Sequence, residues 1–77
     1  MEDKKTRALS RVEEGETVTV VSVHGGRGLR NRLTTMGLLP KIQIRVVHNG
    51  RFGPFVVSIK NSRIAIGRGV ADKIMVM

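Results

Sequence analysis

The chain has 77 residues, with 14 Lys and Arg against six Asp and Glu, which gives a formal net charge of +8 at pH 7. It contains no cysteine, so it can build neither a disulfide nor a thiolate metal site. No run approaches the roughly 20 apolar residues of a membrane span, and the start, MEDKKTRALS, lacks the apolar centre of a signal peptide. We therefore expect one small cytoplasmic domain over residues 1–77, with residues 1–8 frayed.

The charge is distributed unevenly along the chain. Residues 1–16 hold five acids and four bases, whereas residues 17–77 hold ten bases and a single acid, Asp72. A body this basic attracts an anionic surface, which could be nucleic acid, an acidic protein or lipid headgroups. The alternative is that the charge only keeps the chain in solution.

The segment before the first long strand predicts a single turn. Ser10 and Glu13 have the spacing of a capping box, and Gly15 follows too soon for a longer helix. The next segment, TVTVVSVH at 17–24, is rich in β-branched residues and predicts a strand.

The valines of that strand fall into two sets. Val18 and Val20 share one parity, while Val21 and Val23 share the other, so one straight strand cannot bury all four on one face. A β-bulge would shift the register and curve the strand, as a small closed barrel requires.

Three glycines, Gly25, Gly26 and Gly28, follow the strand. They raise the question of a phosphate-binding loop, but neither the Walker pattern nor the dinucleotide fingerprint is present. We favour a tight corner of small residues.

A short helix is predicted over residues 28–36. Leu29, Leu33 and Met36 recur at i, i+4 and i+7, which places one apolar stripe on a helix, and Gly37 suits its C-terminal end. No other segment predicts a substantial helix.

The rest of the chain predicts short strands separated by turns. Apolar residues alternate within 42–46, 55–60 and 64–66, one helical turn is expected at 70–73, and 74–77 is short and apolar. Asn49 and Gly50 are a hairpin signal, but Gly53 and Pro54 lie just beyond, so the connection could exceed two residues. About five strands with turns every 8 to 12 residues predict a mainly β fold in a small closed barrel. An exposed terminal strand could pair between copies, so a homo-oligomer is one option.

The residues for catalysis and for metal binding are scarce. Asp72 is the one carboxylate after residue 16, and His24 and His48 are far apart, each beside a turn. We therefore expect no enzyme activity, no catalytic residue, no cofactor and no metal site.

Arginines around the predicted helix leave one catalytic role open. Arg27, Arg30 or Arg32 could be supplied in trans to a nucleotide hydrolase and stabilise its transition state. The alternative is that they are solvated charges. On a helical wheel, Arg32 lies close to the apolar stripe, whereas Arg30 points further towards solvent.

The order and spacing of several motifs make the sequence resemble the FeoA family of small bacterial and archaeal proteins associated with ferrous iron uptake. The resemblance covers residues 9–76. It rests on Gly15, Arg32-Leu33, Met36-Gly37-Leu38-Leu39-Pro40, Gly53-Pro54, Ile64-Ala65-Ile66 and Ala71-Asp72-Lys73-Ile74-Met75-Val76. Lys41 departs from the family pattern, which usually has Gly after the Pro. A lysine there favours a type I turn over a type II turn, which needs a positive φ.

The resemblance implies an SH3-like barrel that acts with FeoB, a membrane transporter with a cytosolic GTP-binding domain. A similar barrel occurs in DtxR-type metal-dependent repressors. The implied role is an accessory or regulatory protein of ferrous iron uptake, one that binds the transporter and does not carry iron. The sequence does not say whether binding would stimulate or inhibit GTP hydrolysis, or leave it unchanged.

We expect the partner-binding residues to be Arg32, Leu38, Leu39, Lys41 and Phe52. Adjacent leucines rarely both point inwards, and an exposed leucine beside basic side chains is a plausible anchor. The alternative is that both leucines complete the core where helix meets strand.

Nucleic-acid binding is the alternative function. The basic body would supply phosphate contacts. Against this, single-strand binders stack bases on aromatic side chains, and the chain has only two phenylalanines.

Overall fold

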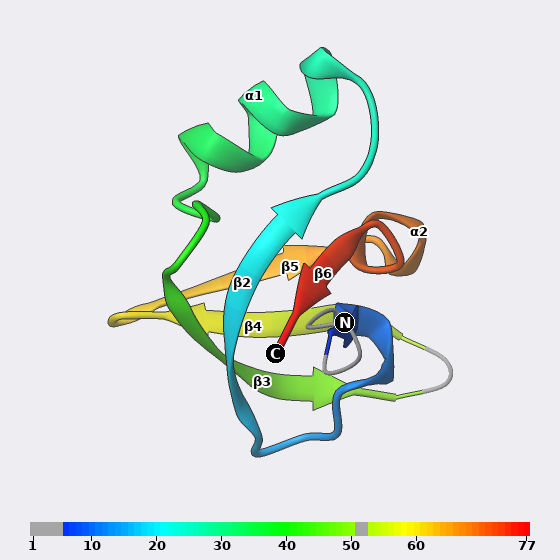
Figure 1. Cartoon of the computed structure of the whole chain (residues 1–77). Coiled ribbons are helices and arrows are strands. Elements are labelled where there is room, and N and C mark those ends of the chain that lie inside the picture. Colours follow the sequence, from blue (N-terminus) through cyan, green and yellow to red (C-terminus); the bar gives the residue numbers. More distant parts are fainter. Residues whose placement is uncertain (1–5, 51–52) are drawn as a thin grey trace.

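The protein is a curled antiparallel sheet with one helix above it (Figure 1). The computed structural model describes residues 6–50 and 53–77, within which six strands run in the order β1-β6-β2-β3-β4-β5. The strands are β1 (Arg7–Ala8), β2 (Thr17–Val23), β3 (Gln43–Asn49), β4 (Phe55–Ile59), β5 (Ser62–Ile66) and β6 (Ile74–Val76). The helices are the 3-10 turn η2 (Leu9–Arg11), α1 (Arg27–Thr35) and the short α2 (Arg68–Ala71). The predicted SH3-like barrel with one inserted helix is confirmed.

Strand β2 joins the two halves of the barrel because each half of β2 has a different neighbour. Its first residues pair with β3 and its last residues pair with β6, and the register shifts between Val20 and Ser22. The shift leaves Val21 36% exposed while Val18, Val20 and Val23 are buried. The predicted bulge is therefore confirmed, and it bends β2 from one half into the other.

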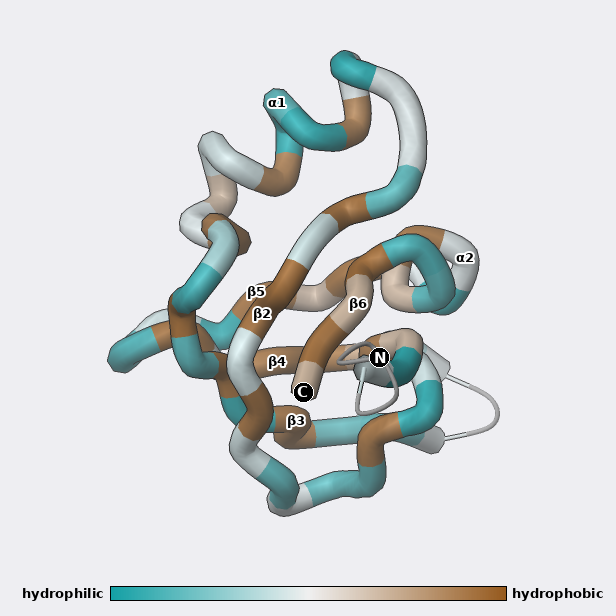
Figure 2. The backbone as a smooth tube through the Cα atoms, in the orientation of Figure 1, coloured by the Kyte–Doolittle hydropathy of each residue, from teal (hydrophilic) through white to brown (hydrophobic). Residues whose placement is uncertain are grey.

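The core is apolar throughout the described residues, where no polar or charged side chain is buried. Figure 2 shows the apolar residues concentrated along β2, β4 and β6, with a hydrophilic turn between β4 and β5. From α1, Leu33 is buried, and Leu29 and Met36 pack against the core half-buried. The predicted apolar stripe is confirmed.

A glycine makes the corner between β2 and α1. Gly25 has a φ of +143°, and a Cβ at this position would lie 2.9 Å from Leu29 Cδ2. Any larger residue would therefore strain the backbone and push the end of the Leu29 side chain aside. This supports the corner interpretation of the three glycines.

Two predictions for the start of the chain are wrong. The Ser10 hydroxyl does not cap a helix; it donates a hydrogen bond to Asp72 Oδ1, which is far away in the sequence. Residues Arg7–Ala8 are not frayed, because β1 pairs with β6. Residues 1–5 lie outside the described part of the chain.

Strand β6 is not the exposed strand that the sequence suggested. It lies between β1 and β2 and pairs with both. The ends of the sheet are β1 and β5 instead, so pairing between copies through a terminal strand stays a prediction for β1 and not for β6.

The turn after α1 also differs from the expected one. Ile42 N–H donates to Leu39 O at 3.2 Å, closing a turn in which Lys41 has a φ of 74°. The type I prediction is therefore wrong, since that turn has no positive φ. The cause is pairing with β2: Lys41 N–H donates to Val20 O at 2.7 Å, and Val20 N–H donates to Ile42 O at 2.9 Å.

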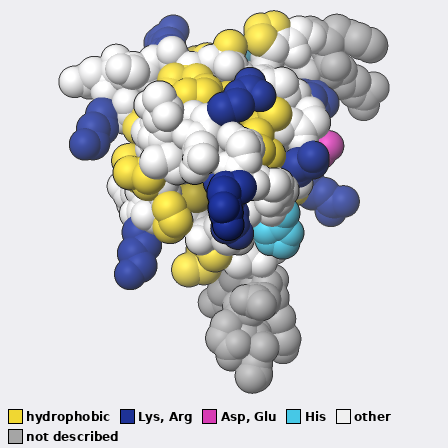
Figure 3. Space-filling view, turned by 90° about the horizontal axis from the view of Figure 1, so that it is seen from above, with side chains coloured by type: hydrophobic (Ala, Val, Ile, Leu, Met, Phe, Trp, Pro, Cys, Tyr) yellow, Lys and Arg dark blue, Asp and Glu magenta, His cyan; other side chains and the backbone are white. Residues whose placement is uncertain are grey.

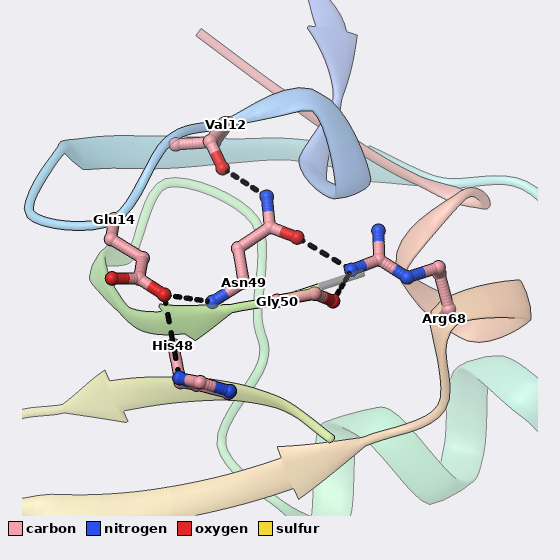
Figure 4. Close-up of polar contacts among 6 residues, drawn as sticks. All are labelled: Val12, Glu14, His48, Asn49, Gly50 and Arg68. Atoms are coloured by element: carbon pink, nitrogen blue, oxygen red, sulfur yellow. Dashed lines mark hydrogen bonds and ion pairs between the residues drawn. The ribbon is translucent and has the colours of Figure 1, made fainter. Parts of the chain in front are cut away.

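Asn49 ends β3 and ties three segments together (Figure 4). Its Nδ2 donates to Val12 O at 2.6 Å and to Ser10 O at 3.3 Å. Its Oδ1 accepts from Arg68 Nη2 at 2.7 Å, and its main-chain N–H donates to Glu14 Oε2 at 2.9 Å. Because β4 begins only at residue 55, the connection is longer than two residues, which was one of the two options that the sequence left open.

Candidate protein-interaction surface

The two leucines after α1 point in opposite directions. The helix ends in a Schellman motif: Leu38 N–H donates to Leu33 O at 2.9 Å, and Gly37 N–H donates to Thr34 O at 3.0 Å. The motif turns Leu38 back onto the core, where it is 1% exposed, and leaves Leu39 42% exposed.

Leu38 has almost no exposed surface to offer a partner, and its part in partner binding stays a prediction. Its side chain is already enclosed by the core, whereas Leu39 keeps the apolar surface that an anchor needs. Gly37 directly after the apolar stripe was the sequence signal that could have separated the two leucines.

The remaining predicted contacts do not form one patch. Arg32 is exposed and lines a small hollow between α1 and the β5–α2 side, with Leu29 and Val70. Lys41 is exposed and faces a different hollow, on the β3 side. Phe52 lies outside the described residues.

A groove runs between α1 and β2 instead. It encloses about 330 Å³ and is lined by Val21, Ser22, Val23, Arg30, Thr34, Leu38 and Pro40. Arg30 and Thr34 are four residues apart, so they share the helix face that looks towards β2. We call this the α1–β2 groove.

Arg30, not Arg32, is the arginine of this groove. Its Nε donates to Val23 O at 3.4 Å, so the side chain folds back across the groove towards β2. Sequence reasoning missed this residue because a helical wheel shows the apolar stripe of the helix. It does not show that β2 lies beside the helix face that carries Arg30.

The lining of the groove is mostly apolar, and Arg30 is its one charged side chain among the described residues. On the face seen from above, apolar side chains lie among Lys and Arg side chains (Figure 3). No acidic side chain of the described residues lines the groove. Such a surface suits a partner that presents apolar and acidic side chains.

The histidines and carboxylates do not gather into a site. Within residues 6–50 and 53–77, no three His, Asp or Glu side chains lie together. His48 Nδ1 lies 3.3 Å from Glu14 Oε2, and the main-chain N–H of His24 donates to Lys73 O. None of the described helices is long and apolar enough to cross a membrane.

Comparisons with known proteins agree on one family. The model of the FeoA domain matches residues 7–77. A protein of Methanocaldococcus jannaschii named "Putative Fe(2+) transport protein A" is 44% identical over 68 residues, which cover 88% of this chain and 82% of that protein.

Solved structures show the same barrel. A crystal structure of an iron uptake regulatory protein (FeoA) has a TM-score of 0.85 at 36% identity, covering 94% of this chain and 95% of that one. FeoA from Chlorobium tepidum has a TM-score of 0.81 at 27% identity, over 90% of this chain and 67% of that one. A manganese-dependent transcriptional repressor shares the fold, with a TM-score of 0.87 at 23% identity, over 95% of this chain and 41% of the repressor. The family model, the relative and the barrel thus lead to one conclusion: the chain belongs to the FeoA family.

Proposed function

We propose that this protein is an accessory and regulatory protein of ferrous iron uptake, and that it binds the cytosolic part of a FeoB-type GTP-binding transporter. Family membership and the iron-transport name of the relative support the first part. The observation that carries the second part is the α1–β2 groove, which is largely apolar, contains Arg30 and is open to solvent.

The fold turns two apolar side chains outwards: Val21, which lines this groove, and Leu39, which lies in the sequence between the lining residues Leu38 and Pro40. Val21 is exposed because of the bulge in β2, and Leu39 is exposed because of the Schellman motif. Both are held by rigid backbone features, so little conformational entropy is lost when a partner covers them. Full burial of such a side chain is worth about 1.5–3 kcal/mol, and covering the 36% of Val21 or the 42% of Leu39 that is exposed yields a proportionate part of it.

Arginines supply the charged part of the contact. Arg30 crosses the groove, and Arg32 lies on the other shoulder of α1. Each can meet a carboxylate of the partner in bidentate geometry. Lys41 lies on a different face and belongs to a separate surface.

The test is titration of the transporter's isolated cytosolic domain with wild-type protein and with Leu39→Ala. Removing the exposed leucine should weaken binding about tenfold, which corresponds to roughly 1.4 kcal/mol. The fold should be retained, because the side chain is outside the core. Met77→Ala is the matched control, since Met77 is 59% exposed and is neither a lining residue of the groove nor next to one in the sequence.

An unchanged affinity for Leu39→Ala would contradict this binding site, and no binding by the wild type would contradict the proposed partner. GTP hydrolysis measured in the same titration gives the direction of regulation. An Arg30→Lys variant tests a role in hydrolysis, because it keeps the charge but removes the planar guanidinium.

The structure gives less support to nucleic-acid binding than the sequence did. Phe55 is 1% exposed and cannot stack on a base. Phe52 lies outside the described residues. No described aromatic side chain therefore offers the stacking surface of single-strand binders.

A further inference from the structure

Two lysines have backbone conformations that are unusual for lysine. Among residues 6–50 and 53–77, Lys41 at φ 74° and Lys60 at φ 58° are the non-glycine residues with positive φ. Lys41 lies in the turn before β3, and Lys60 lies in the turn between β4 and β5. Glycine adopts this conformation at lower cost, so both side chains can be removed by a substitution that suits the backbone.

Both lysines line the same hollow. It encloses about 570 Å³ on the outer face of β3 and β4, and Arg45 and Ser58 also line it. A second hollow of about 440 Å³ adjoins it, shares Arg45 and Ser58, and adds Arg63.

The strand register aligns these residues in one row. Arg45 on β3 pairs with Ser58 on β4, and Ser58 pairs with Arg63 on β5. Paired residues on neighbouring strands point to the same face, roughly 5 Å apart, so a hydroxyl lies between two guanidinium groups. We call Lys41, Arg45, Lys60 and Arg63 the cationic sheet face.

The charges of this face are not neutralised by the described part of the chain. The ion pairs between described residues are Arg7 with Glu16 and His48 with Glu14. Glu14 is the one acid that lines either hollow, and its Oε2 is already engaged by His48 and by the Asn49 N–H. Four cations are therefore free to attract an anionic surface.

We propose that the cationic sheet face binds the phosphate groups of anionic lipids at a membrane surface. Charge complementarity supports an anionic occupant, and a row of cations across a sheet suits a layer of headgroups. The choice of lipid rests on the proposed function, which places the protein beside a membrane transporter.

The cationic sheet face lacks the features that would favour a nucleic acid as its ligand. Helix α1, the one described helix long enough to enter a major groove, lines neither hollow. No described aromatic ring is exposed for base stacking, since Phe55 is buried.

The test is flotation with vesicles made of equal parts phosphatidylglycerol and phosphatidylcholine, compared with pure phosphatidylcholine. Wild-type protein should bind the anionic vesicles at low salt, lose binding as salt rises, and ignore the neutral ones. The double variant Lys41→Gly/Lys60→Gly should bind at least tenfold more weakly, since each cation contributes roughly fivefold. Glycine suits both backbone conformations, so this loss cannot come from unfolding.

A control variant with the same net charge as Lys41→Gly/Lys60→Gly separates the effect of the cationic sheet face from the effect of the protein's overall charge. Arg11→Gln/Lys73→Gln removes two exposed cations near η2 and α2, neither of which lines the two hollows. Its binding to the anionic vesicles should fall distinctly less than that of the Lys41→Gly/Lys60→Gly variant. A second test variant, Arg45→Gln/Arg63→Gln, should behave like the glycine pair.

Three results would overturn the proposal: unchanged binding by both test variants, an equal loss in the control, or tighter binding to duplex DNA than to anionic vesicles at the same salt. The vesicles contain no transporter, so this outcome is independent of the proposed function. The glycine pair should in turn keep wild-type affinity for the soluble transporter domain.

Discussion

Lys41 is a residue whose backbone conformation is set by its neighbours. Its N–H is fixed by Val20 O, and the adjoining turn is closed by the bond from Ile42 N–H to Leu39 O. Sequence reasoning from residue type alone predicted a negative φ, since lysine disfavours the left-handed region. The pairing with β2, a segment about 20 positions away, overrides that preference, and a local pattern does not contain this information.

Lys41→Gly should stabilise the protein. A left-handed non-glycine residue costs about 1–2 kcal/mol, and the greater freedom of glycine in the unfolded chain cancels about 0.5–1 kcal/mol of the gain. We expect the free energy of unfolding to rise by roughly 0.5–1 kcal/mol in urea titrations. Lys41→Ala keeps the strain and should show no gain; a gain equal to that of glycine would contradict this explanation.

Glu16 connects β1 to the start of β2. Its Oε1 accepts a hydrogen bond from Arg7 Nη2 at 2.8 Å, and its Oε2 accepts one from Glu13 N–H at 2.9 Å. The Arg7 bond and then the Glu13 N–H hold the pKa of this carboxyl below its ordinary value of 4.5.

The lowered pKa predicts a loss of stability in acid. Above pH 4.5 the carboxylate is ionised in both states, and its contribution is fully present. As the pH falls through the lowered pKa, the unfolded chain has already taken up the proton, so the contribution is lost. Thermal melts should show Glu16→Gln less stable than wild type at neutral pH, with the difference disappearing in acid.

Glu13→Gln provides the comparison for this pH series. This variant keeps the hydrogen bond from the main-chain N–H of residue 13 to Glu16 Oε2, so its melting temperature should change with pH as that of the wild type does. A Glu16→Gln difference that stays constant with pH would contradict the linkage.

At the scale of elements, the entry into α1 depends on which glycine is changed. Gly25→Ala places a Cβ 2.9 Å from Leu29 Cδ2 at a φ of +143°. It should lower the free energy of unfolding by about 2 kcal/mol, mainly from backbone strain and in part from displacement of the Leu29 side chain. Urea unfolding measures the change.

Gly28 is the matched control. It lies inside α1 with open space around its Cα, so Gly28→Ala should stabilise by about 0.5–1 kcal/mol. Equal effects of the two alanines would contradict the steric account of the corner.

The elements that could be predicted are those encoded by local periodicity. The two parities of valine predicted the bulge in β2, and Leu29, Leu33 and Met36 predicted the stripe of α1. The contact of Ser10 with Asp72 could not be found in this way, because the two residues are 62 positions apart. The α1–β2 groove was missed for the same reason, since its two walls come from a strand and from the shoulder of a helix.

At the scale of the whole molecule, two surfaces lie on different parts of the barrel. The α1–β2 groove is apolar and lies beside the helix, whereas the cationic sheet face lies over β3, β4 and β5. A protein that binds a membrane and a membrane protein needs separate surfaces for the two tasks. The two surfaces share no residue, so substitutions can test them independently.

Asn49 connects the parts that form the barrel. Asn49→Ala would leave the carbonyls of Ser10 and Val12 and the Arg68 side chain without these bonds, at a cost of about 2 kcal/mol or more in urea unfolding. Asn31→Ala is the control, because Asn31 is exposed on α1 and only its main-chain carbonyl accepts a described bond. A loss as large for Asn31→Ala would contradict the role of the Asn49 side chain.

The Asn49 contacts also bear on how the molecule opens. One side chain joins η2, the end of β3 and the start of α2, segments that are up to 58 positions apart between Ser10 and Arg68. The chain has no cysteine and so no disulfide, and the hydrogen bonds of this side chain hold the distant segments together instead. Because releasing any one segment leaves polar groups of the others unsatisfied, separate fraying is penalised. The amides of η2 and α2 should therefore exchange with solvent at similar rates, in a single cooperative event in which both ends of the barrel open together.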